Sequence, residues 1–208
     1  NAYRRPDKYS IITENKVEYA LSAAIYKVTS ESTPVFLVPK SYCNAEAVSS
    51  GLESTLIANN FTVDYAEGFL SDLLVEANYD YYSGVILAGT TEDISDDDRV
   101  ALEKFLDNKG KKGKSFFYFA STKTYKFENL CGFLADWGIG FKPGILYLPS
   151  EKTSEGLMLM SLKTEYTKLT DSMNKYLVAS NVVPMLQLYE TNTTATYIRE
   201  TNVLMQTA

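Results

Sequence analysis

Two stretches of the chain carry residues whose types and spacing are suited to chemistry. The first runs from Glu92 to Asp98, with five carboxylates in seven positions, and directly follows Thr90 and Thr91. Clustered carboxylates can bind a cation or move protons. The second is Cys43, in the segment PKSYCNAE, where a turn from a strand into a helix can activate a thiolate. These two stretches are the candidate sites to be weighed.

The absence of histidine limits what either candidate can do. The sequence contains no histidine, which excludes Ser-His-Asp and Cys-His nucleophiles and histidine metal ligation, and leaves acid and base roles to Asp, Glu, Lys, Tyr or Cys. Without a base beside it, Cys43 is better interpreted as a partly buried thiol than as a nucleophile. We interpret Cys131, in ENLCGFLADW, as a small apolar residue of a helix. No CxxC pair suggests zinc or a disulfide scaffold.

The carboxylates themselves fit the start of a helix. Ser95 can cap a helix with Asp98 three residues on, and the carboxylates at 96–98 fall in the first turn, near the positive end of the helix dipole. A calcium loop would need alternating ligands and a terminal bidentate Glu, which are absent. We therefore favour a helix cap over a metal site. Thr90, Thr91, Glu92 and Asp93 remain candidates for ligand or partner contact, because they follow a buried strand.

Helical and apolar segments alternate along most of the chain. Spacing of apolar residues predicts helices at 14–29, 45–57, 69–77, 95–108 and 127–137. Short apolar runs predict strands at 34–39, 61–65, 84–88 and 115–120, with extended candidates over 139–148. In the helix at 95–108 we expect Val100, Phe105 and Leu106 in the core. This alternation predicts a three-layer α/β fold with a mostly parallel sheet, flavodoxin-like in strand order 2-1-3-4. Its carboxyl edge is where such folds bind ligands.

Length and composition predict one soluble domain. The chain has 208 residues, 45% apolar and 22% charged, which is ordinary for a globular protein. We expect a single domain over 1–208, with an α/β core at about 14–148 and an extension at about 149–208 whose strands and loops complete the edge of the sheet. No apolar run is long enough to cross a bilayer. Because the sequence begins with Asn, we expect that a preceding portion was removed, together with any signal or anchor.

Charge and motifs exclude several partners. The net charge of -6 argues against nucleic acid, which needs clustered cations. Neither GxGxxG nor GxxxxGK[ST] follows a strand, so no nucleotide cofactor is expected, and no other cofactor is indicated. Tyr79, Tyr81 and Tyr82 form an aromatic cluster that fits core and edge packing better than a partner surface, although both readings stay open.

Four segments, in order, resemble the GldG-like auxiliary domain of ABC-type transport systems. ENKVEYALSAAIYKVTSESTPVFLV (14–38) is similar to its first helix and proline-led strand. The segment 79–121 resembles its strand, "DLS" helix start and glycine-rich helix exit. ENLCGFLADWGIGF (128–141) resembles its "NLxxLLxxYGI" segment, and NVLMQTA (202–208) its closing strand. One departure stands out: VPKSYCNAE replaces the "TGHGE" turn found after the first strand of many members, which speaks against a ligand role there.

The resemblance implies a fold and a setting. The fold would be related to class I glutamine amidotransferases and flavodoxins. The setting would be the extracytoplasmic side of the cell membrane, in a membrane-anchored protein working beside an ABC permease and its ATPase, tethered by segments outside this chain. We expect a non-catalytic role in protein contact or ligand sensing. Two alternatives stay open: a degenerate amidotransferase-like enzyme using Cys43 or a carboxylate of 92–98, and a small-molecule-binding domain with a pocket between the first and third strands.

Overall fold

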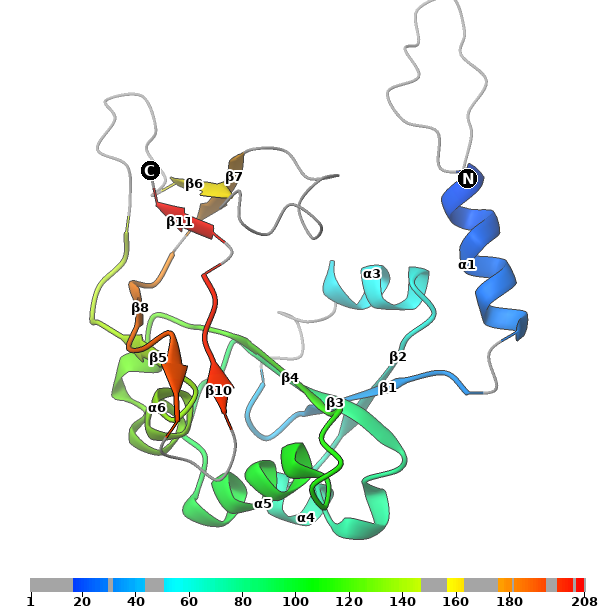
Figure 1. Ribbon diagram of the computed structural model, residues 1–208, viewed down its shortest axis with the longest axis horizontal. Helices are drawn as coiled ribbons and strands as arrows, with labels where there is room; N and C mark the ends of the chain where they lie inside the picture. Colours follow the sequence, from blue (N-terminus) through cyan, green and yellow to red (C-terminus); the bar gives the residue numbers. More distant parts are fainter. Residues whose placement is uncertain are drawn as a thin grey trace, which may run out of the picture.

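A four-stranded parallel sheet forms the centre of the protein. The computed structural model describes residues 17–29, 32–43, 51–146, 157–162, 176–180, 182–193, 198–203 and 205–207 (Figure 1). The strands of the central sheet are β1 (Val35–Pro39), β2 (Thr62–Ala66), β3 (Tyr82–Ala88) and β4 (Ser115–Phe119). They lie in the order β2-β1-β3-β4, and every neighbouring pair is parallel. The predicted strand order 2-1-3-4 is therefore confirmed.

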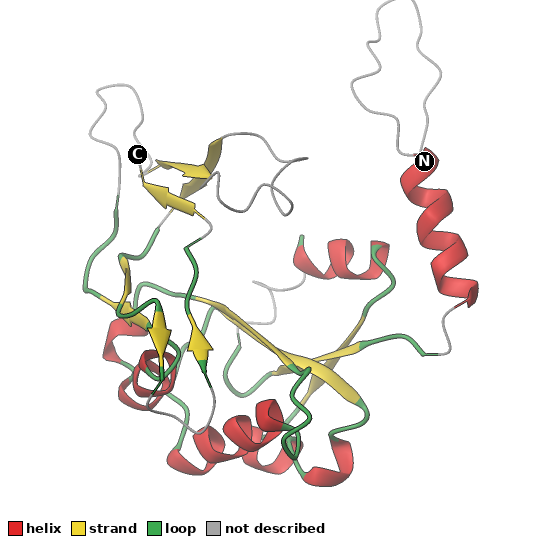
Figure 2. Cartoon of the chain, viewed as in Figure 1, coloured by secondary structure: helices red, strands yellow, loops and turns green. Residues whose placement is uncertain are grey.

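Helices lie on both sides of this sheet. They are α1 (Val17–Thr29), α3 (Leu52–Ala58), α4 (Leu70–Leu73), α5 (Asp96–Asp107) and α6 (Glu128–Ala135), with 3-10 turns η1 (Glu76–Asn78) and η2 (Thr124–Lys126). Figure 1 shows α3 on one side of the strands and α4 and α5 on the other, and Figure 2 shows the same layers by element type. The protein is thus a three-layer α/β fold, as predicted. Part of the second predicted helix, residues 45–50, lies outside the described residues.

The inner strands form the core because their sequences are apolar on both faces. All of β1 is buried, and every residue of β3 except Ser83 is buried, whereas β4 alternates between half-buried and exposed side chains. This is the pattern of a parallel sheet covered by helices on both faces. The largest fully buried side chains include Phe105 and Leu102 of α5, Leu70 of α4 and Phe133 of α6.

Helix α5 confirms the predicted boundaries but corrects one core residue. It begins after Ser95 and ends at Asn108, which is in the left-handed conformation with φ 48°. Phe105 is fully buried and Leu106 is half-buried, as expected, but Val100 is 45% exposed. Val100 lies two positions from the buried Leu102, and residues two apart point to nearly opposite sides of a helix. The prediction of Val100 as a core residue is therefore wrong.

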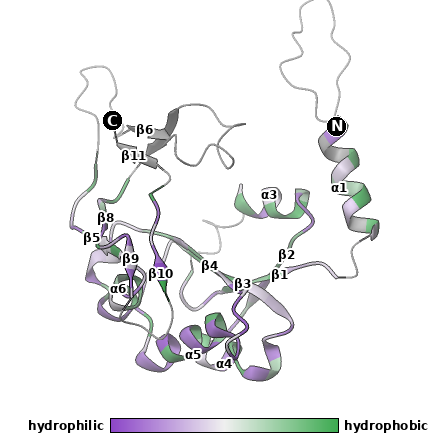
Figure 3. Ribbon diagram, viewed as in Figure 1, coloured by the Kyte–Doolittle hydropathy of each residue, from purple (hydrophilic) through white to green (hydrophobic). Residues whose placement is uncertain are grey.

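Helix α1 stands apart from the sheet. Its apolar side chains are exposed, with Leu21 at 60% and Val28 at 82%, although the helix itself is as predicted. Figure 3 shows apolar stretches on α1 and α3. A hydrogen bond of 2.7 Å from Asn60 Nδ2 to the Ala23 carbonyl connects α1 to the end of α3. No helix among the described residues is long and apolar enough to cross a membrane.

The segments after α6 form small antiparallel sheets instead of completing the edge of the central sheet. The strands are β5 (Ile139–Phe141), β6 (Leu157–Leu162), β7 (Tyr176–Ser180), β8 (Met185–Gln187), β9 (Thr191–Asn192), β10 (Arg199–Glu200) and β11 (Met205–Thr207). They pair as β5-β8, β9-β10 and β11-β6-β7, so the predicted completion of the sheet edge is wrong. Gly140 allows the close approach of Leu188, the residue after β8, since a Cβ there would lie 2.9 Å from Leu188 Cδ2.

Candidate functional site

The loops after β1 and β3 meet at the carboxyl edge of the sheet, as the strand order requires. The backbone N–H of Thr91 donates to the Tyr42 carbonyl at 3.4 Å, and the Cys43 Sγ lies 3.6 Å from the Ile86 carbonyl that accepts its hydrogen bond. The structure therefore brings Thr91 beside Tyr42, the residue before Cys43. Glu92 is exposed beside them, and Asp93 points toward a different element.

Cys43 is buried at this edge. Its side chain and backbone are 8% exposed, and burial raises the pKa of the thiol, although a hydrogen bond from the Ala88 backbone acts in the opposite direction. A raised pKa keeps the sulfur protonated near neutral pH, and the thiolate is the nucleophilic form. Burial also raises the pKa of Cys131, with the nearby Asp93 charge adding to the effect, and its Sγ donates to the Thr124 carbonyl at 3.1 Å. Both thiols are therefore held in the less reactive form.

Asp93 caps a helix that begins 35 residues later in the chain. Its Oδ2 accepts from the Asn129 backbone N–H at 2.8 Å, and its Oδ1 accepts from the Leu130 backbone N–H at 3.0 Å. The Asn129 side chain returns a hydrogen bond of 2.8 Å to the Ile94 carbonyl. These are the N–H groups that the first turn of a helix leaves without partners, and a carboxylate there also meets the positive helix end. Asp93 thus fixes α6 to the loop after β3.

Ser95 and Asp98 form the expected capping box, and Asp98 also accepts hydrogen bonds from two other segments. The Asp98 backbone N–H donates to Ser95 Oγ at 3.1 Å, and the Ser95 backbone N–H donates to Asp98 Oδ2 at 3.0 Å. The Asp98 carboxylate is fully buried, and it also accepts from the Tyr42 hydroxyl and from the Ser71 backbone N–H, the latter at 2.8 Å. One carboxylate therefore links the loop after β1, the start of α4 and the start of α5.

These contacts move the pKa values of both partners. Burial alone would raise the pKa of Asp98, but the hydrogen bonds from Ser95, Tyr42 and the Ser71 backbone together lower it below its ordinary value. Burial raises the pKa of Tyr42, and the hydrogen bond to Asp98 raises it further. Both shifts favour an ionised carboxylate with a protonated phenol. Groups of three or more side chains that could hold a metal ion were not found among the described residues.

Thr90 belongs to a buried hydroxyl cluster that the sequence analysis did not identify. Its Oγ1 donates to the Tyr118 hydroxyl at 3.3 Å, and its carbonyl accepts from Ser121 Oγ at 3.2 Å. The Tyr118 hydroxyl also shares a hydrogen bond with Thr124 Oγ1, which is fully buried and accepts from the Ser121 backbone N–H. The only sequence signal is the polar segment after β4. This cluster joins the loops after β3 and β4.

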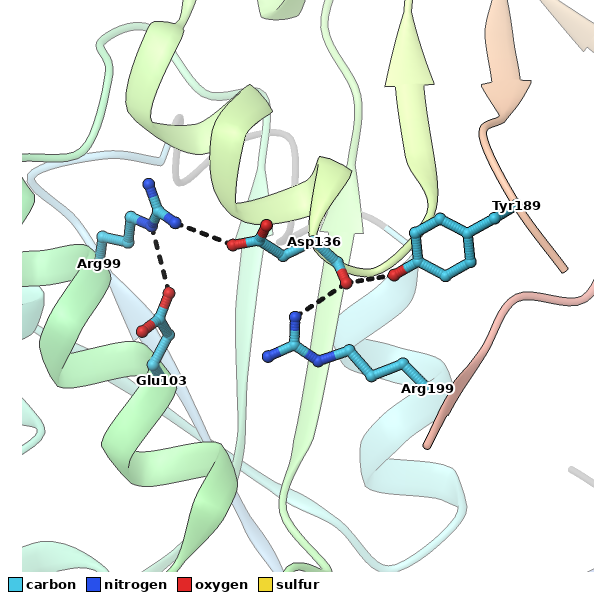
Figure 4. Close-up of polar contacts among 5 residues, drawn as sticks. All are labelled: Arg99, Glu103, Asp136, Tyr189 and Arg199. Carbon is cyan, nitrogen blue, oxygen red and sulfur yellow. Dashed lines mark hydrogen bonds and ion pairs between the residues drawn. The ribbon is translucent and has the colours of Figure 1, made fainter. Parts of the chain in front are cut away.

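A second polar network connects α5, α6 and the C-terminal strands (Figure 4). The Arg99 guanidinium donates to Asp136 Oδ2 at 2.8 Å and to Glu103 Oε1 at 3.2 Å. The Asp136 carbonyl accepts from the Tyr189 hydroxyl and, at 2.8 Å, from Arg199. The side chains of Arg99 and Asp136 are 34% and 46% exposed, so their ion pair adds little to the stability of the protein in solvent. Apart from the i,i+4 pair of Arg99 and Glu103, sequence spacing gave no signal for these contacts, because they join positions 37 to 63 residues apart.

Comparison with known proteins supports the fold. No protein-family model matches the chain, and no curated protein matches it. Among solved structures, the chain is similar to the mmIFT52 N-terminal domain, with a TM-score of 0.55 and 14% identity over 72% of this chain and 67% of that one. It is also similar to a ThuA-like protein from Bacteroides uniformis, with a TM-score of 0.50 and 15% identity over 74% of this chain and 61% of that one.

These likenesses establish the fold alone. The chain has a flavodoxin-like α/β fold, and the ThuA-like neighbour places it with glutamine amidotransferase-like folds. The carboxyl edge, where such folds bind ligands, is occupied in this chain by internal hydrogen bonds of Tyr42, Thr90, Asp93 and Asp98. The arrangement stabilises three loops, and it holds Cys43 as a buried thiol.

Proposed function

We propose that this chain is a non-catalytic, extracytoplasmic domain of a GldG-like auxiliary protein in an ABC transport system, with a role in protein contact. The observation that carries the non-catalytic part is the state of the carboxyl edge. There the thiol has a raised pKa, and the buried carboxylate and phenol are bonded to each other. Groups engaged in this way act as structural supports for loops. The setting beside a permease and an ATPase is supported by the resemblance of four ordered segments to the GldG-like domain.

Fractionation of cells that express the full-length protein tests the setting. We expect the protein in the membrane fraction, with this domain cleaved by protease added to spheroplasts and protected in intact inverted vesicles. We also expect it to co-purify with an ABC permease and ATPase encoded nearby. Recovery of the full-length protein in the cytosol, with protease access only after lysis, would refute the extracytoplasmic part of the proposal.

The enzyme alternative requires Cys43 to be a reactive nucleophile. An amidotransferase-like mechanism needs a thiolate that forms near neutral pH, whereas burial raises the pKa of this thiol. Replacement of Cys43 by serine therefore distinguishes the two readings. We expect Cys43→Ser to leave transport by the complete system unchanged, because the thiol contributes packing and a hydrogen bond to the Ile86 carbonyl that a serine hydroxyl can also make. Loss of transport with an intact fold and normal abundance would favour the enzyme.

A further inference from the structure

The central sheet ends at β4, and a cavity lies beside it. In the flavodoxin-like strand order a fifth strand continues the sheet next to β4. Here β5 follows α6 in the chain but pairs antiparallel with β8, and within the part of the chain that the structure describes β4 pairs with β3 alone. A cavity of about 420 Å³ lies between β4 and β5, because side chains of both strands line it. We call it the β4 cavity.

The chain itself bounds the β4 cavity on both sides. Phe116 and Phe117 are neighbours on β4 and so lie on opposite faces of the sheet, yet both line the cavity, which therefore extends along the edge of the strand. Phe141 of β5 lines the other side, and its ring meets the Tyr118 ring with centroids 6.1 Å apart. Because β5 already lies against Tyr118, the remaining space fits a small molecule better than a further strand.

The size and lining of the β4 cavity are those of a ligand site. Such sites are concave spaces of about 300–1,000 Å³, lined mainly by apolar and aromatic side chains with a few polar groups. The aromatic side chains of this lining are Phe116, Phe117, Tyr118, Phe133, Trp137 and Phe141. Aromatic rings attract one another in stacked or edge-to-face arrangements. An aromatic ligand therefore suits the cavity.

Lys114 gives the cavity a positive charge. It lines the cavity and is half-buried, and its ammonium donates to the Tyr79 carbonyl and, at 2.8 Å, to the Tyr82 carbonyl. Among the described residues no ion pair engages it. An ammonium has three N–H groups, so these two carbonyls leave one for a ligand. A half-buried cation beside apolar side chains favours an anionic ligand, because a charge removed from water needs a partner.

A second cavity, of about 430 Å³, adjoins the β4 cavity at this lysine. The two share Lys114 and Trp137 in their linings. Arg199 lines the second cavity, where its guanidinium lies 4.8 Å from the centroid of the Trp137 ring and donates to the Asp136 carbonyl (Figure 4). Both cavities therefore present a cation beside the same indole ring.

The carboxylates of the second cavity do not serve as partners for Lys114. Glu103 and Asp107 both line that cavity. Glu103 pairs with Arg99 at 3.2 Å, and Asp107 pairs with Lys112. Each carboxylate is thus engaged by another cation, and the place of an anion beside Lys114 is left to a ligand.

We propose that the β4 cavity binds a small aromatic carboxylate, whose rings lie among the aromatic side chains and whose carboxylate accepts a hydrogen bond from Lys114. The site lies at the β4 end of the sheet and so differs from the pocket between the first and third strands that the sequence suggests as an alternative. Ligand binding here goes beyond the contact role proposed above, and it does not require the setting beside a permease.

Titration of the purified chain with naphthalene-2-carboxylate tests the proposal. Isothermal titration calorimetry measures the affinity. NMR reports the place, since the chain has one tryptophan and Trp137 therefore gives a single indole N–H signal. We expect saturable binding together with a shift of that signal. The uncharged naphthalene-2-carboxamide should bind roughly tenfold more weakly, because a carboxylate makes the stronger, charge-assisted hydrogen bond with an ammonium.

Two phenylalanines of β4 provide a matched pair of variants. Phe117 and Phe119 lie on the same face of the strand and are 45% and 46% exposed, but only Phe117 lines the cavity. We expect Phe117→Ala to weaken binding of the carboxylate by roughly threefold to tenfold, because an aromatic contact is lost. Phe119→Ala should retain the affinity of the native chain.

A second pair of variants tests the charge. Lys114→Met removes the ammonium and keeps an unbranched side chain. We expect the affinity for the carboxylate to fall to about that for the carboxamide, whereas a merely structural role would weaken both ligands equally. Lys111→Met, at an exposed lysine that lines neither cavity, should change neither affinity. If Lys114→Met unfolds, the comparison of the two ligands and the phenylalanine pair still decide the question.

Three results would overturn the inference. Absence of binding by the carboxylate at millimolar concentration would remove the β4 cavity as a ligand site. Equal affinities of the native chain for the carboxylate and the carboxamide would remove the anionic group from the ligand class. Binding that Phe117→Ala leaves unchanged, with no shift of the Trp137 signal, would place the ligand elsewhere on the chain. Cell fractionation, which tests the proposed setting, is independent of all three.

Discussion

Replacement of Asp98 by asparagine tests whether the buried carboxylate holds the loops at the carboxyl edge. Asparagine keeps the shape of the side chain but replaces one oxygen by an NH2 group and removes the charge. In the native protein Oδ1 accepts from the Ser71 N–H, and Oδ2 accepts from Ser95 and Tyr42. In either orientation the NH2 group of the variant faces a donor, so at least one buried donor loses its acceptor.

The expected loss of stability follows from these contacts. A hydrogen bond to a charged group is worth about 1.5–3 kcal/mol, and a buried donor without a partner costs about 1–3 kcal/mol. Because the variant keeps one oxygen that can still accept, we expect Asp98→Asn to lower the free energy of unfolding by roughly 2–4 kcal/mol. Urea unfolding followed by circular dichroism measures this as a lower midpoint with an unchanged slope.

The control is Asp97→Asn, one residue away in the same helical turn. Asp97 is exposed, so its carboxylate contributes only the helix-end interaction, about 0.3–1 kcal/mol. Equal losses in the two variants would show that burial and the contacts with Ser71 and Tyr42 add nothing. The reasoning given for Asp98 would then be refuted.

The pH dependence gives a second check. The folded-state pKa of Asp98 is lowered, so its contribution to stability is complete above the pKa of the unfolded chain, about 3.9. The contribution is lost as the pH falls through the folded-state pKa. The difference in stability between the native protein and Asp98→Asn should therefore be constant above about pH 5 and shrink in more acidic solution. A difference that stays constant at low pH would contradict the lowered pKa.

Three further changes have defined outcomes. Ser95→Ala should lower stability by roughly 0.5–2 kcal/mol. Calcium added to the native protein should leave the melting temperature unchanged. A calcium-dependent rise would restore the interpretation of the acidic turn as a metal site. In the Cys131→Ser variant, Cys43 is the thiol that remains. It should react with a thiol reagent much more slowly in the folded than in the urea-unfolded chain, because burial raises its pKa. Equal rates at neutral pH would contradict this. Gly84→Ala should destabilise by roughly 1–3 kcal/mol, since its Cβ would lie 2.5 Å from Phe36 Cε1 and 2.7 Å from the Ser115 carbonyl oxygen. Gly51→Ala, whose Cβ would meet no atom within 4 Å, should cost less in the same unfolding assay, because it loses only the preference for glycine at the N-cap of α3.

Local sequence patterns predicted the central fold well. The apolar runs of β1 and β3 predicted buried parallel strands, because strands covered on both faces must be apolar throughout. Ser95 and Asn108 marked the ends of α5, because capping depends on neighbouring residues. The count of one domain over 1–208 stays a prediction.

Features that depend on distant residues could not be read from the sequence. Asp93 caps α6 across 36 positions, and Tyr42 meets Asp98 across 56. Neither pair has a periodic signal, and each exists only because the fold brings separate loops to one edge. The pairing of β5 with β8 was missed for a related reason, since three-residue strands carry too little pattern to identify their partners. Among the candidate site residues, Thr91 bonds to Tyr42, the neighbour of Cys43, because the loops after β1 and β3 lie at the same edge; a ligand role for these residues stays a prediction.

The exposed apolar side of α1 has a consequence for how the chain unfolds. A helix of 13 residues is near the length at which isolated helices, about 12–15 residues, are marginal in water. Leu21 and Ile25 are more than half exposed, so packing adds little of the free energy that normally sustains a helix in a protein. We therefore expect the helix and the sheet to open as separate cooperative units. Amide hydrogens of α1 should exchange with solvent through local opening of the helix. Those of β1 and β3 should exchange only when the whole sheet unfolds.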